Sequence, residues 1–458
     1  MKARHICIFI CSIIAMMALL SWGFPDKSIV VGSTTLRWPS LQQVLTTSEP
    51  DSSSTPDTSE PDSSSYPDAS VSTPTISDSL PTVDRRSNAP LSRGEATVID
   101  WIDPLRQALA QADSSVVRVV HFGDSQLEGD RLSMNVRRHL QSQYGGGGVG
   151  IVPLHQTIGT RTIHQTLTMN GEAQSTGGGP KRYLVYGPKK NRRTTNVYGP
   201  MGQVAVMNDS LCPGSEHLTL ALSPMSNEHQ TERYFNRVRV LTGSSIAVNV
   251  RGAKRLENGL YQLPDSSVRC TIDFNGKGDV YGISLEQQYG VVVDNIPMRG
   301  CAGTIFTGIR KQEMQDFFAA TNTRLIILQY GGNVVPYTAD ESKMNAYIQR
   351  LRAQVRYMKS CAPESAILFI GPSDMLTSIN GQKTTYPIIP KMDAALQDMA
   401  NEEHIGYWSL FKAMGGKGGM LRWQQQGLAG SDGVHFTRKG ADTAGEKLAQ
   451  FIEDELAK

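Results

Sequence analysis

The chain has 458 residues, more than one compact domain of ordinary size holds. Hydrophobic residues make up 39% of it, enough for a packed core, and 45 Lys and Arg residues nearly balance 43 Asp and Glu residues. This balance gives no support for nucleic-acid binding, which usually shows as a basic excess.

The first segment is basic and then apolar. Lys2, Arg4 and His5 precede an apolar run from Ile6 to about Phe24, the pattern of an export signal. No clean Ala-x-Ala cleavage site follows, so an uncleaved signal-anchor is the alternative, because a run of roughly 18 residues is at the lower limit for a membrane span. We expect residues 1–24 to direct export to the periplasm or the cell surface, either as a cleaved signal or as a membrane tether.

Residues 25–94 are predicted to be a disordered linker. Ser, Thr, Pro and Asp dominate from about residue 46 to residue 93, and Glu-Pro-Asp-Ser-Ser-Ser occurs at both 49–54 and 60–65. Such a segment cannot bury enough apolar surface to offset its ordering entropy.

Cysteines occur in two groups. Cys7 and Cys11 lie in the apolar run, whereas the other four lack the close Cys-x-x-Cys or Cys/His spacing of a zinc site. In an exported protein these four could form disulfides in three full pairings, and buried free thiols are an equally good interpretation. The four are Cys212, Cys270, Cys301 and Cys361.

The folded part begins near residue 95 with a helix at about 98–112 and a buried strand at 116–122. The strand stops at a Gly-Asp-Ser turn, and the residues from Leu127 to about Tyr144 favour a helix. Ser125 therefore lies at the carboxyl end of a strand, where ligands bind in open α/β sheets and where a helix amino end offers free N–H groups. We hypothesise that Ser125 is a nucleophile; an ordinary turn serine is the alternative.

A block of different character follows the glycine run at 145–148. Residues 149–288 are rich in Gly, Thr and Asn and contain short alternating segments such as 203–206, 246–250 and 270–274. This pattern indicates a β-sandwich or jelly roll of about 140 residues, a normal domain size.

Alternating strands and helices resume after the block. They predict a parallel sheet with helices on both faces, so that 95–148 and 289–458 form one α/β domain into which the β domain is inserted. The expected strands are 289–296, 324–330, 366–370 and 404–408, and the expected helices are 314–321, 341–360, 390–403 and 439–456.

A serine hydroxyl needs a base, usually a histidine, and the histidine needs a partner that fixes its tautomer. Asp432 and His435 stand three residues apart just before the last helix, a spacing that can bring a carboxylate beside an imidazole on a loop. Asp124, although next to the serine, is interpreted as a turn-shaping residue. Asn333 follows a strand and two glycines, and Gly300 follows another strand, so each could donate to an oxyanion; turn residues are the alternatives.

These motifs together resemble the SGNH (GDSL-type) hydrolase superfamily. The resemblance implies a three-layer α/β/α fold, with Ser125 as nucleophile, His435 as base and Asp432 as its partner. It also implies an oxyanion hole from the N–H groups of Ser125 and Gly300 and the side chain of Asn333; Gly303 competes with Gly300 for this assignment. The motifs are Phe122-Gly123-Asp124-Ser125, Gly300, Gly331-Gly332-Asn333 and Asp432-Gly433-Val434-His435. Two positions depart from the family pattern: Gln126 replaces a common Leu, and Val334 replaces an acidic residue.

The arrangement is most similar to bacterial peptidoglycan O-acetylesterases, in which a carbohydrate-binding-like β domain follows the serine block. This similarity implies removal of O-acetyl groups from muramic acid, with acetylated polysaccharide as the partner and with no metal or cofactor. A polysaccharide O-acetyltransferase and a non-catalytic carbohydrate-binding surface protein are the alternatives. A lipase is disfavoured because no long apolar lid segment lies near the motifs.

Overall fold

The computed structural model describes residues 29–31, 34–36, 100–225 and 231–458. The predicted export signal and most of the predicted linker lie outside these residues. Within the linker, strands β1 (Ile29–Val31) and β2 (Thr34–Leu36) pair antiparallel. No helix in the described ranges is long and apolar enough to cross a membrane.

A five-stranded parallel sheet organises the α/β part, in the order β16-β3-β17-β18-β21. The central strands are predominantly apolar and buried on both faces, as a parallel sheet covered by helices requires. The strands are β3 (Val116–Gly123), β16 (Gly290–Pro297), β17 (Thr323–Gln329), β18 (Ala366–Ile370) and β21 (Gly406–Trp408).

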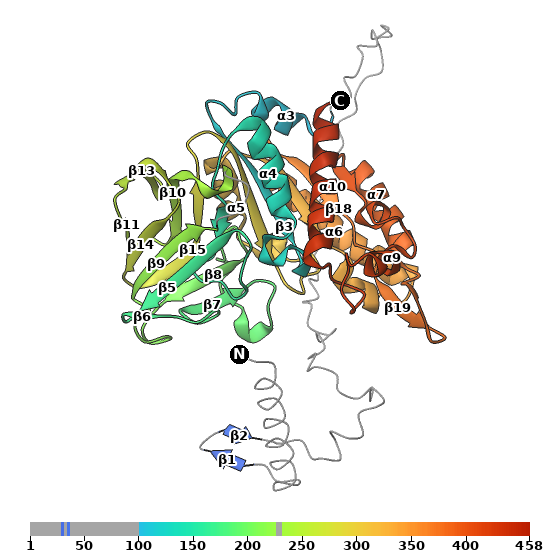
Figure 1. The fold of residues 1–458 in the computed structure, drawn as a ribbon, viewed down its shortest axis with the longest axis horizontal. Helices are drawn as coiled ribbons and strands as arrows, with labels where there is room; N and C mark the ends of the chain where they lie inside the picture. The colour runs from blue at the N-terminus through green and yellow to red at the C-terminus, as the bar shows by residue number, and fades with distance from the viewer. Residues whose placement is uncertain (1–28, 32–33, 37–99, 226–230) are drawn as a thin grey trace, which may run out of the picture. The chain divides into compact units, whose positions relative to one another are not determined.

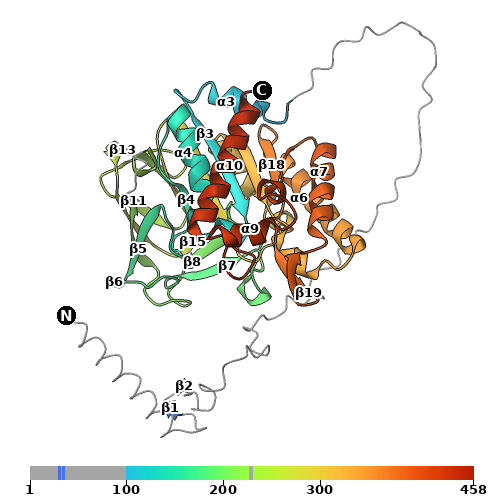
Figure 2. The ribbon, with the colours of Figure 1, turned by 45° about the vertical axis from the view of Figure 1, so that its right-hand side comes forward.

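Helices cover both faces of this sheet, which confirms the predicted three-layer fold. Val117 and Val119 face a core shared with α3, α4 and α10, whereas Val120 and Phe122 face a core shared with α5, α6 and α7. Figures 1 and 2 show α4 and α10 side by side over the first face. The helices are α3 (Asp103–Leu109), α4 (Ser133–Tyr144), α5 (Lys311–Ala320), α6 (Glu341–Cys361), α7 (Ile389–Glu402), α8 (Leu410–Ala413), α9 (Gly419–Gln425) and α10 (Arg438–Leu456).

The inserted block forms two antiparallel sheets that enclose their own apolar core. One sheet has the order β12-β13-β10-β15-β8-β7 with β4 added to β15, and the other has the order β11-β14-β9-β5-β6. The strands are β4 (Gly150–Val152), β5 (Ile163–Met169), β6 (Glu172–Ala173), β7 (Lys181–Leu184), β8 (Gln203–Met207), β9 (His217–Pro224), β10 (Phe235–Thr242), β11 (Ala247–Val250), β12 (Lys254–Arg255), β13 (Leu260–Ser267), β14 (Cys270–Asn275) and β15 (Gly278–Glu286). This additional β domain agrees with the predicted fold class; its boundaries at 149 and 288 stay a prediction.

The chain enters and leaves the insert at adjacent points beside β16. The Val291 N–H donates to the Gly145 carbonyl at 3.0 Å, and Gly146 forms a bridge with Val291. A Cβ on Gly146 would lie 2.4 Å from the Val291 backbone, and its φ of 106° also favours glycine. The glycine run that the sequence presents as a loop signal thus allows two backbones to cross closely.

Buried charges join the insert to the sheet. Arg118 on β3 forms ion pairs with Asp294 on β16 and with Glu286 on β15, and all three side chains are fully buried. Asp294 also accepts a 2.8 Å hydrogen bond from the Ile151 N–H on β4. Arg118, the polar interruption in an otherwise apolar strand, therefore links β3 to the insert through buried charges.

Local structure differs from expectation after Ser125 and in three short segments of the α/β part. The helix predicted directly after Ser125 is replaced by a 3₁₀ segment, η1 (Ser125–Asp130), and α4 begins only at Ser133. Gly129, with φ 72°, interrupts the regular helix there. The hairpin β19 (Leu376–Ile379) and β20 (Gln382–Thr385) and the short helices α8 and α9 were not predicted, because their segments carry little apolar periodicity. The remaining 3₁₀ segments are η2 (Lys189–Asn191), η3 (Thr231–Arg233), η4 (Phe306–Gly308) and η5 (Gly332–Tyr337).

Candidate active site

Ser125 begins η1 at the carboxyl end of β3, as the sequence predicts. Asp124 caps this segment, since its Oδ1 accepts from the Gln126 N–H at 2.9 Å. The Ser125 carbonyl accepts a 2.7 Å hydrogen bond from Arg131 Nη2. Both ends of the serine turn are therefore held by polar contacts while the hydroxyl stays available.

A continuous hydrogen-bond chain joins the three residues predicted as the triad. Ser125 Oγ lies 3.1 Å from His435 Nε2, and His435 Nδ1 lies 2.8 Å from Asp432 Oδ2. Asp432 Oδ1 accepts from the backbone N–H groups of Val434 and His435 at 3.0 Å each. This geometry places a base against the hydroxyl and an orienting carboxylate behind the base.

The Asp432 carboxylate stays ionised readily. Partial burial raises its pKa, but hydrogen bonds from the Val434 N–H, the His435 ring and the His435 N–H outweigh burial and hold the pKa below its usual value. The side chains of Asp432 and His435 are 50% and 43% exposed, so water has access to the base. An ionised carboxylate favours the imidazole tautomer whose Nδ1 is protonated and whose Nε2 can accept the serine proton.

Contacts between loops hold the base loop against the serine turn. Gln126 Nε2 donates to the Val434 carbonyl at 2.8 Å, and the Leu376 N–H donates to the Gly433 carbonyl at 3.0 Å. A Cβ on Gly433 would lie 2.9 Å from the Leu376 side chain, which explains the glycine between Asp432 and Val434. Gln126, which departs from the family pattern, is thus a structural link between the two site loops.

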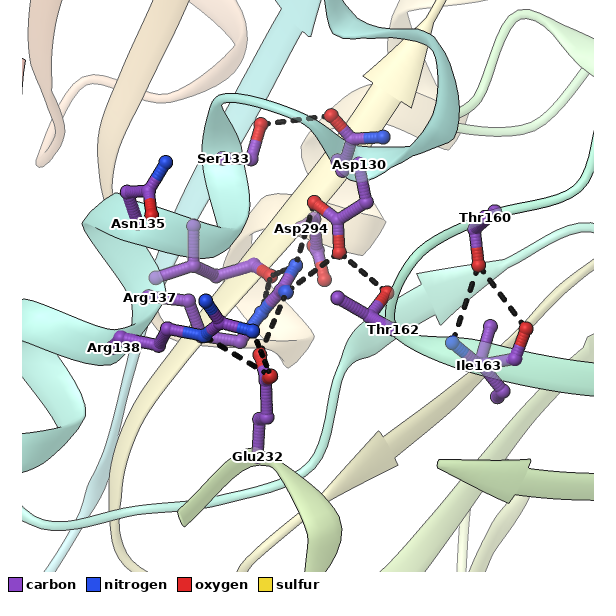
Figure 3. A network of polar contacts seen from close by, with 12 residues as sticks. Asp130, Ser133, Asn135, Arg137, Arg138, Thr160, Thr162, Ile163, Glu232 and Asp294 are labelled. Atoms are coloured by element: carbon purple, nitrogen blue, oxygen red, sulfur yellow. Dashed lines mark hydrogen bonds and ion pairs between the residues drawn. The ribbon is translucent and has the colours of Figure 1, made fainter. Parts of the chain in front are cut away.

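Figure 3 shows a polar network around Asp130 at the end of η1. Asp130 closes η1 with φ 57° and accepts from Arg137 Nη1 at 2.7 Å. Thr162 of the insert donates to the same carboxylate at 2.7 Å, and Arg137 also lies 3.6 Å from Glu232 of the insert. The end of the segment that begins at Ser125 is therefore held partly by the inserted domain.

Of the predicted oxyanion donors, Gly300 borders open space, whereas Asn333 is hydrogen-bonded within the protein. Gly300 has φ 72° and open space on its Cβ side, and Arg299 before it forms two 2.6 Å hydrogen bonds with Glu128 of η1. Asn333 Nδ2 donates to Asp124 Oδ2 and to the Cys301 carbonyl, each at 3.2 Å. The Asn333 amide therefore lies beside the serine turn but is directed to two protein acceptors. At the competing position, a Cβ on Gly303 would lie 2.5 Å from the Tyr330 ring, so close packing accounts for that glycine.

Asp124 and His121 are buried ionisable groups beside the site. Burial raises the pKa of Asp124 to about 6, although the hydrogen bond from the Gln126 N–H and the nearby His435 oppose the shift. Burial lowers the pKa of His121 to about 3, and its ring nitrogens contact Gln329 Oε1 at 3.1 Å and Ser133 Oγ at 3.0 Å. His121 is therefore a neutral histidine of the core.

The residues around the triad that sequence inspection missed are Arg131, Glu128 and Arg299. Their role depends on the loop path after Ser125, which no local motif encodes. The four cysteines in the described part are free thiols, and no cluster of His, Cys, Asp or Glu there could hold a metal ion.

Comparison with known proteins bears on the family and the fold. Residues 243–443 match the GDSL-like Lipase/Acylhydrolase family. No curated protein matches the chain. A solved structure described as a peptidoglycan O-acetylesterase aligns with a TM-score of 0.61 at 22% identity, covering 80% of this chain and 98% of that one, which shows a shared fold.

Two further solved structures are more distant. An acetyl xylan esterase has 15% identity and a TM-score of 0.28, and the alignment covers 35% of this chain and 81% of that chain. The periplasmic domain of a lipopolysaccharide acetyltransferase from Salmonella ser. Paratyphi A has 14% identity and a TM-score of 0.25, with 36% and 74% covered. Likenesses at these TM-scores carry no argument about this chain. The family match over residues 243–443 and the shared fold support the GDSL/SGNH hydrolase family of esterases and acylhydrolases.

Proposed function

We propose that the protein is an exported serine esterase that removes O-acetyl groups from a cell-envelope polysaccharide, peptidoglycan in the first place. His435 Nε2 takes the Ser125 proton while Oγ attacks the acetyl carbonyl carbon. His435 then gives the proton to the departing sugar oxygen, which leaves an acetyl-enzyme. Water attacks this ester, passes a proton to His435, and releases acetate as Ser125 regains its proton.

The observation that carries the proposal is the unbroken contact from Ser125 Oγ through His435 to Asp432. A scaffold that only binds carbohydrate has no need for this alignment of a nucleophile, a base and an orienting carboxylate.

Hydrolysis is favoured over acetyl transfer by the openness of the site. His435 keeps 43% of its side chain exposed, so water can reach the acetyl-enzyme. A transferase must keep water from that intermediate while a sugar hydroxyl attacks.

The choice of peptidoglycan rests on the shared fold with the structure described as a peptidoglycan O-acetylesterase, which extends over 80% of this chain and so includes the insert. The apolar run and the Ser/Thr/Pro/Asp-rich segment at the amino end support export to the periplasm or cell surface, where such a substrate lies.

The test is acetate release from O-acetylated peptidoglycan, acetylated xylan and an aryl acetate. We expect peptidoglycan to be the preferred polymer, Ser125→Ala to abolish release from all three, and Ser114→Ala, at an exposed serine, to behave as wild type. Unchanged release by Ser125→Ala would overturn the mechanism. Preference for xylan would overturn the substrate, and faster acetylation of an added sugar acceptor than release of acetate would favour the transferase.

A further inference from the structure

A cavity of about 450 Å³ lies between the serine turn and the inserted domain. Glu128 and Asp130 of η1 line the cavity on one side. Arg299, the residue before Gly300, also lines it and is paired with Glu128. Arg182 on β7 and Gln156 line it from the insert. The cavity therefore adjoins both loops that carry the candidate nucleophile and the candidate oxyanion donor.

The charges that line this cavity are compensated except one. Glu128 and Arg299 pair with each other, and Asp130 pairs with Arg137 behind the cavity wall. Arg182 forms no ion pair with any carboxylate in the part of the chain that the structure describes. Arg182 is thus the one charged lining residue without an ion-pair partner in the described part, and an unpaired guanidinium attracts an anionic ligand group.

Arg182 also has hydrogen-bonding capacity to spare. Its Nη1 donates to two neutral oxygens, Thr157 Oγ1 and Gln203 Oε1, each at 3.3 Å. A guanidinium has five N–H donors in a planar fork that matches a carboxylate. These long contacts orient the side chain and leave donors available.

A second, smaller cavity of about 230 Å³ continues from the first and shares Gln156, Thr160 and Ile163 with it. Two of its lining residues have buried polar atoms without a hydrogen-bond partner among the described residues: His155 Nδ1 and Gln165 Oε1. His155 is only 6% exposed, and burial, aided by the charge of Arg182, lowers its pKa to about 4. A neutral imidazole and an amide oxygen can both accept hydrogen bonds from hydroxyl groups.

We propose that the two cavities form an extended glycan subsite in which Arg182 binds a carboxylate carried by the acetylated substrate and His155 and Gln165 accept from its hydroxyls. This assignment rests on the proposed esterase function and makes the enzyme selective for acidic over neutral acetylated saccharides. The carboxylate belongs either to the sugar itself or to a peptide attached to it, and both present the same group to Arg182.

The test compares kcat/KM on three substrates. The first is an O-acetylated disaccharide whose muramic acid has a free lactyl carboxylate, the second is its methyl ester, and the third carries a stem peptide on the lactyl group. For wild type we expect the free acid or the peptide-bearing substrate to exceed the methyl ester about tenfold or more. A higher kcat/KM on the free acid would assign the carboxylate to the sugar, and a higher kcat/KM on the peptide-bearing substrate would assign it to the peptide.

Variants show whether the preference depends on Arg182 itself or only on the overall charge of the protein. Arg182→Gln should remove the preference, mainly through KM, and Arg182→Lys should keep part of it because the charge remains. Arg255→Gln, which removes the same charge at an exposed position on β12, should keep the full preference. Equal kcat/KM on all three substrates for wild type, or an unchanged preference in Arg182→Gln, would overturn the proposal.

Binding measurements test the glycan subsite independently of the proposed esterase activity. Calorimetric titration of the same saccharides into Ser125→Ala measures the subsite without catalysis, and adding Arg182→Gln should weaken binding of the carboxylate form about tenfold or more. Carboxylate-dependent binding without hydrolysis by wild type would refute the esterase and keep the subsite. Hydrolysis with no carboxylate preference in binding or kinetics would refute the subsite and keep the esterase.

Discussion

The Asn333 amide nitrogen donates to Asp124 Oδ2 across 3.2 Å, which links the residue before the candidate nucleophile to the candidate oxyanion donor. Asp124 is thus more than a turn-shaping residue, because the carboxylate that caps η1 also orients Asn333. Both contacts of the Asn333 amide go to acceptors within the protein. For Asn333 to donate to a tetrahedral oxyanion, one N–H group must either leave its acceptor, Asp124 or the Cys301 carbonyl, or donate to that acceptor and to the oxyanion at once.

Replacement of Asn333 tests this donor. We expect Asn333→Ala to lower kcat on an aryl acetate about 10²- to 10³-fold with little change in KM, because an oxyanion donor acts mainly in the transition state. Asn345→Ala on the exposed face of α6 is the matched control. A change in KM alone would show that Asn333 contacts the substrate and not the developing oxyanion.

Asp124→Asn should alter the pH dependence of stability. The folded-state pKa of about 6 lies above the ordinary value of 3.8, so the folded protein binds this proton more tightly than the unfolded chain. The unfolding free energy of wild type therefore loses about 3 kcal/mol from this group as pH rises from about 4 to above 6. The variant lacks this loss.

Thermal unfolding of wild type and Asp124→Asn at pH 4.5 and pH 7.5 checks the sign. Relative to wild type, the variant should gain stability at the higher pH, and other carboxylates cancel in the difference. A gain at pH 4.5 instead would mean that the Asp124 pKa is depressed.

Asp432→Asn should retain the fold and lower kcat about 10³- to 10⁴-fold, because the His435 ring loses the charge that selects its tautomer. Circular dichroism and aryl acetate turnover measure the two effects, with the exposed Asp113→Asn as control. Near-normal turnover would assign the orienting role to another acid.

Gln126→Leu restores the residue common in the family and removes the bond to the Val434 carbonyl. Gln126 Oε1 is buried without a partner, so the change also removes an unsatisfied acceptor, and we expect the unfolding free energy to stay within about 1 kcal/mol of wild type. Turnover should fall severalfold because the base loop is less tightly held. Full activity would show that the Leu376–Gly433 contact holds this loop without Gln126.

Thr162→Val tests whether the inserted domain stabilises the serine turn. The change keeps the shape of a side chain that is 2% exposed but removes its hydrogen bond to the Asp130 carboxylate, and we expect a loss of about 1.5–3 kcal/mol in unfolding free energy. Thr160→Val removes two hydrogen bonds between neutral groups in the same segment, to the Ile163 carbonyl and from the Ile163 N–H, and should cost about 1 kcal/mol. Equal losses in chemical denaturation would contradict a special role for the charged acceptor.

Much of the fold follows from residue patterns. The strand at 366–370 and the helix beginning at Glu341 match their predicted starts because apolar runs and helical spacing encode them locally. The 3₁₀ segment after Ser125 was missed although Gly129 interrupts it locally, and the contact of its last residue, Asp130, with the distant Thr162 has no local sequence signal. The pairing order of the insert is likewise set by contacts between segments far apart in the sequence.

The reactive residues were predictable to a similar degree. Ser125, Asp432 and His435 follow from what a nucleophile, a base and an orienting acid require, and the structure brings them together. The partners that set their environment did not follow: Gln126 was recognised only as a departure, and Arg182 has no motif. Such residues act through distance and burial, which the linear sequence does not contain.

Because the two backbones cross at Gly146 and Val291, the insert could be cut out and the chain rejoined without moving the sheet. The insert nevertheless contributes to the stability of the α/β part. A short peptide could join residues 145 and 291 because they are already hydrogen-bonded. Excision would nevertheless take Glu286 from Arg118 and the Ile151 N–H from Asp294, so that only the Arg118–Asp294 pair of this buried network would remain. A core trimmed in this way needs Arg118 and Asp294 either kept together or both replaced by uncharged residues, because loss of one would leave the other as an unpaired buried charge.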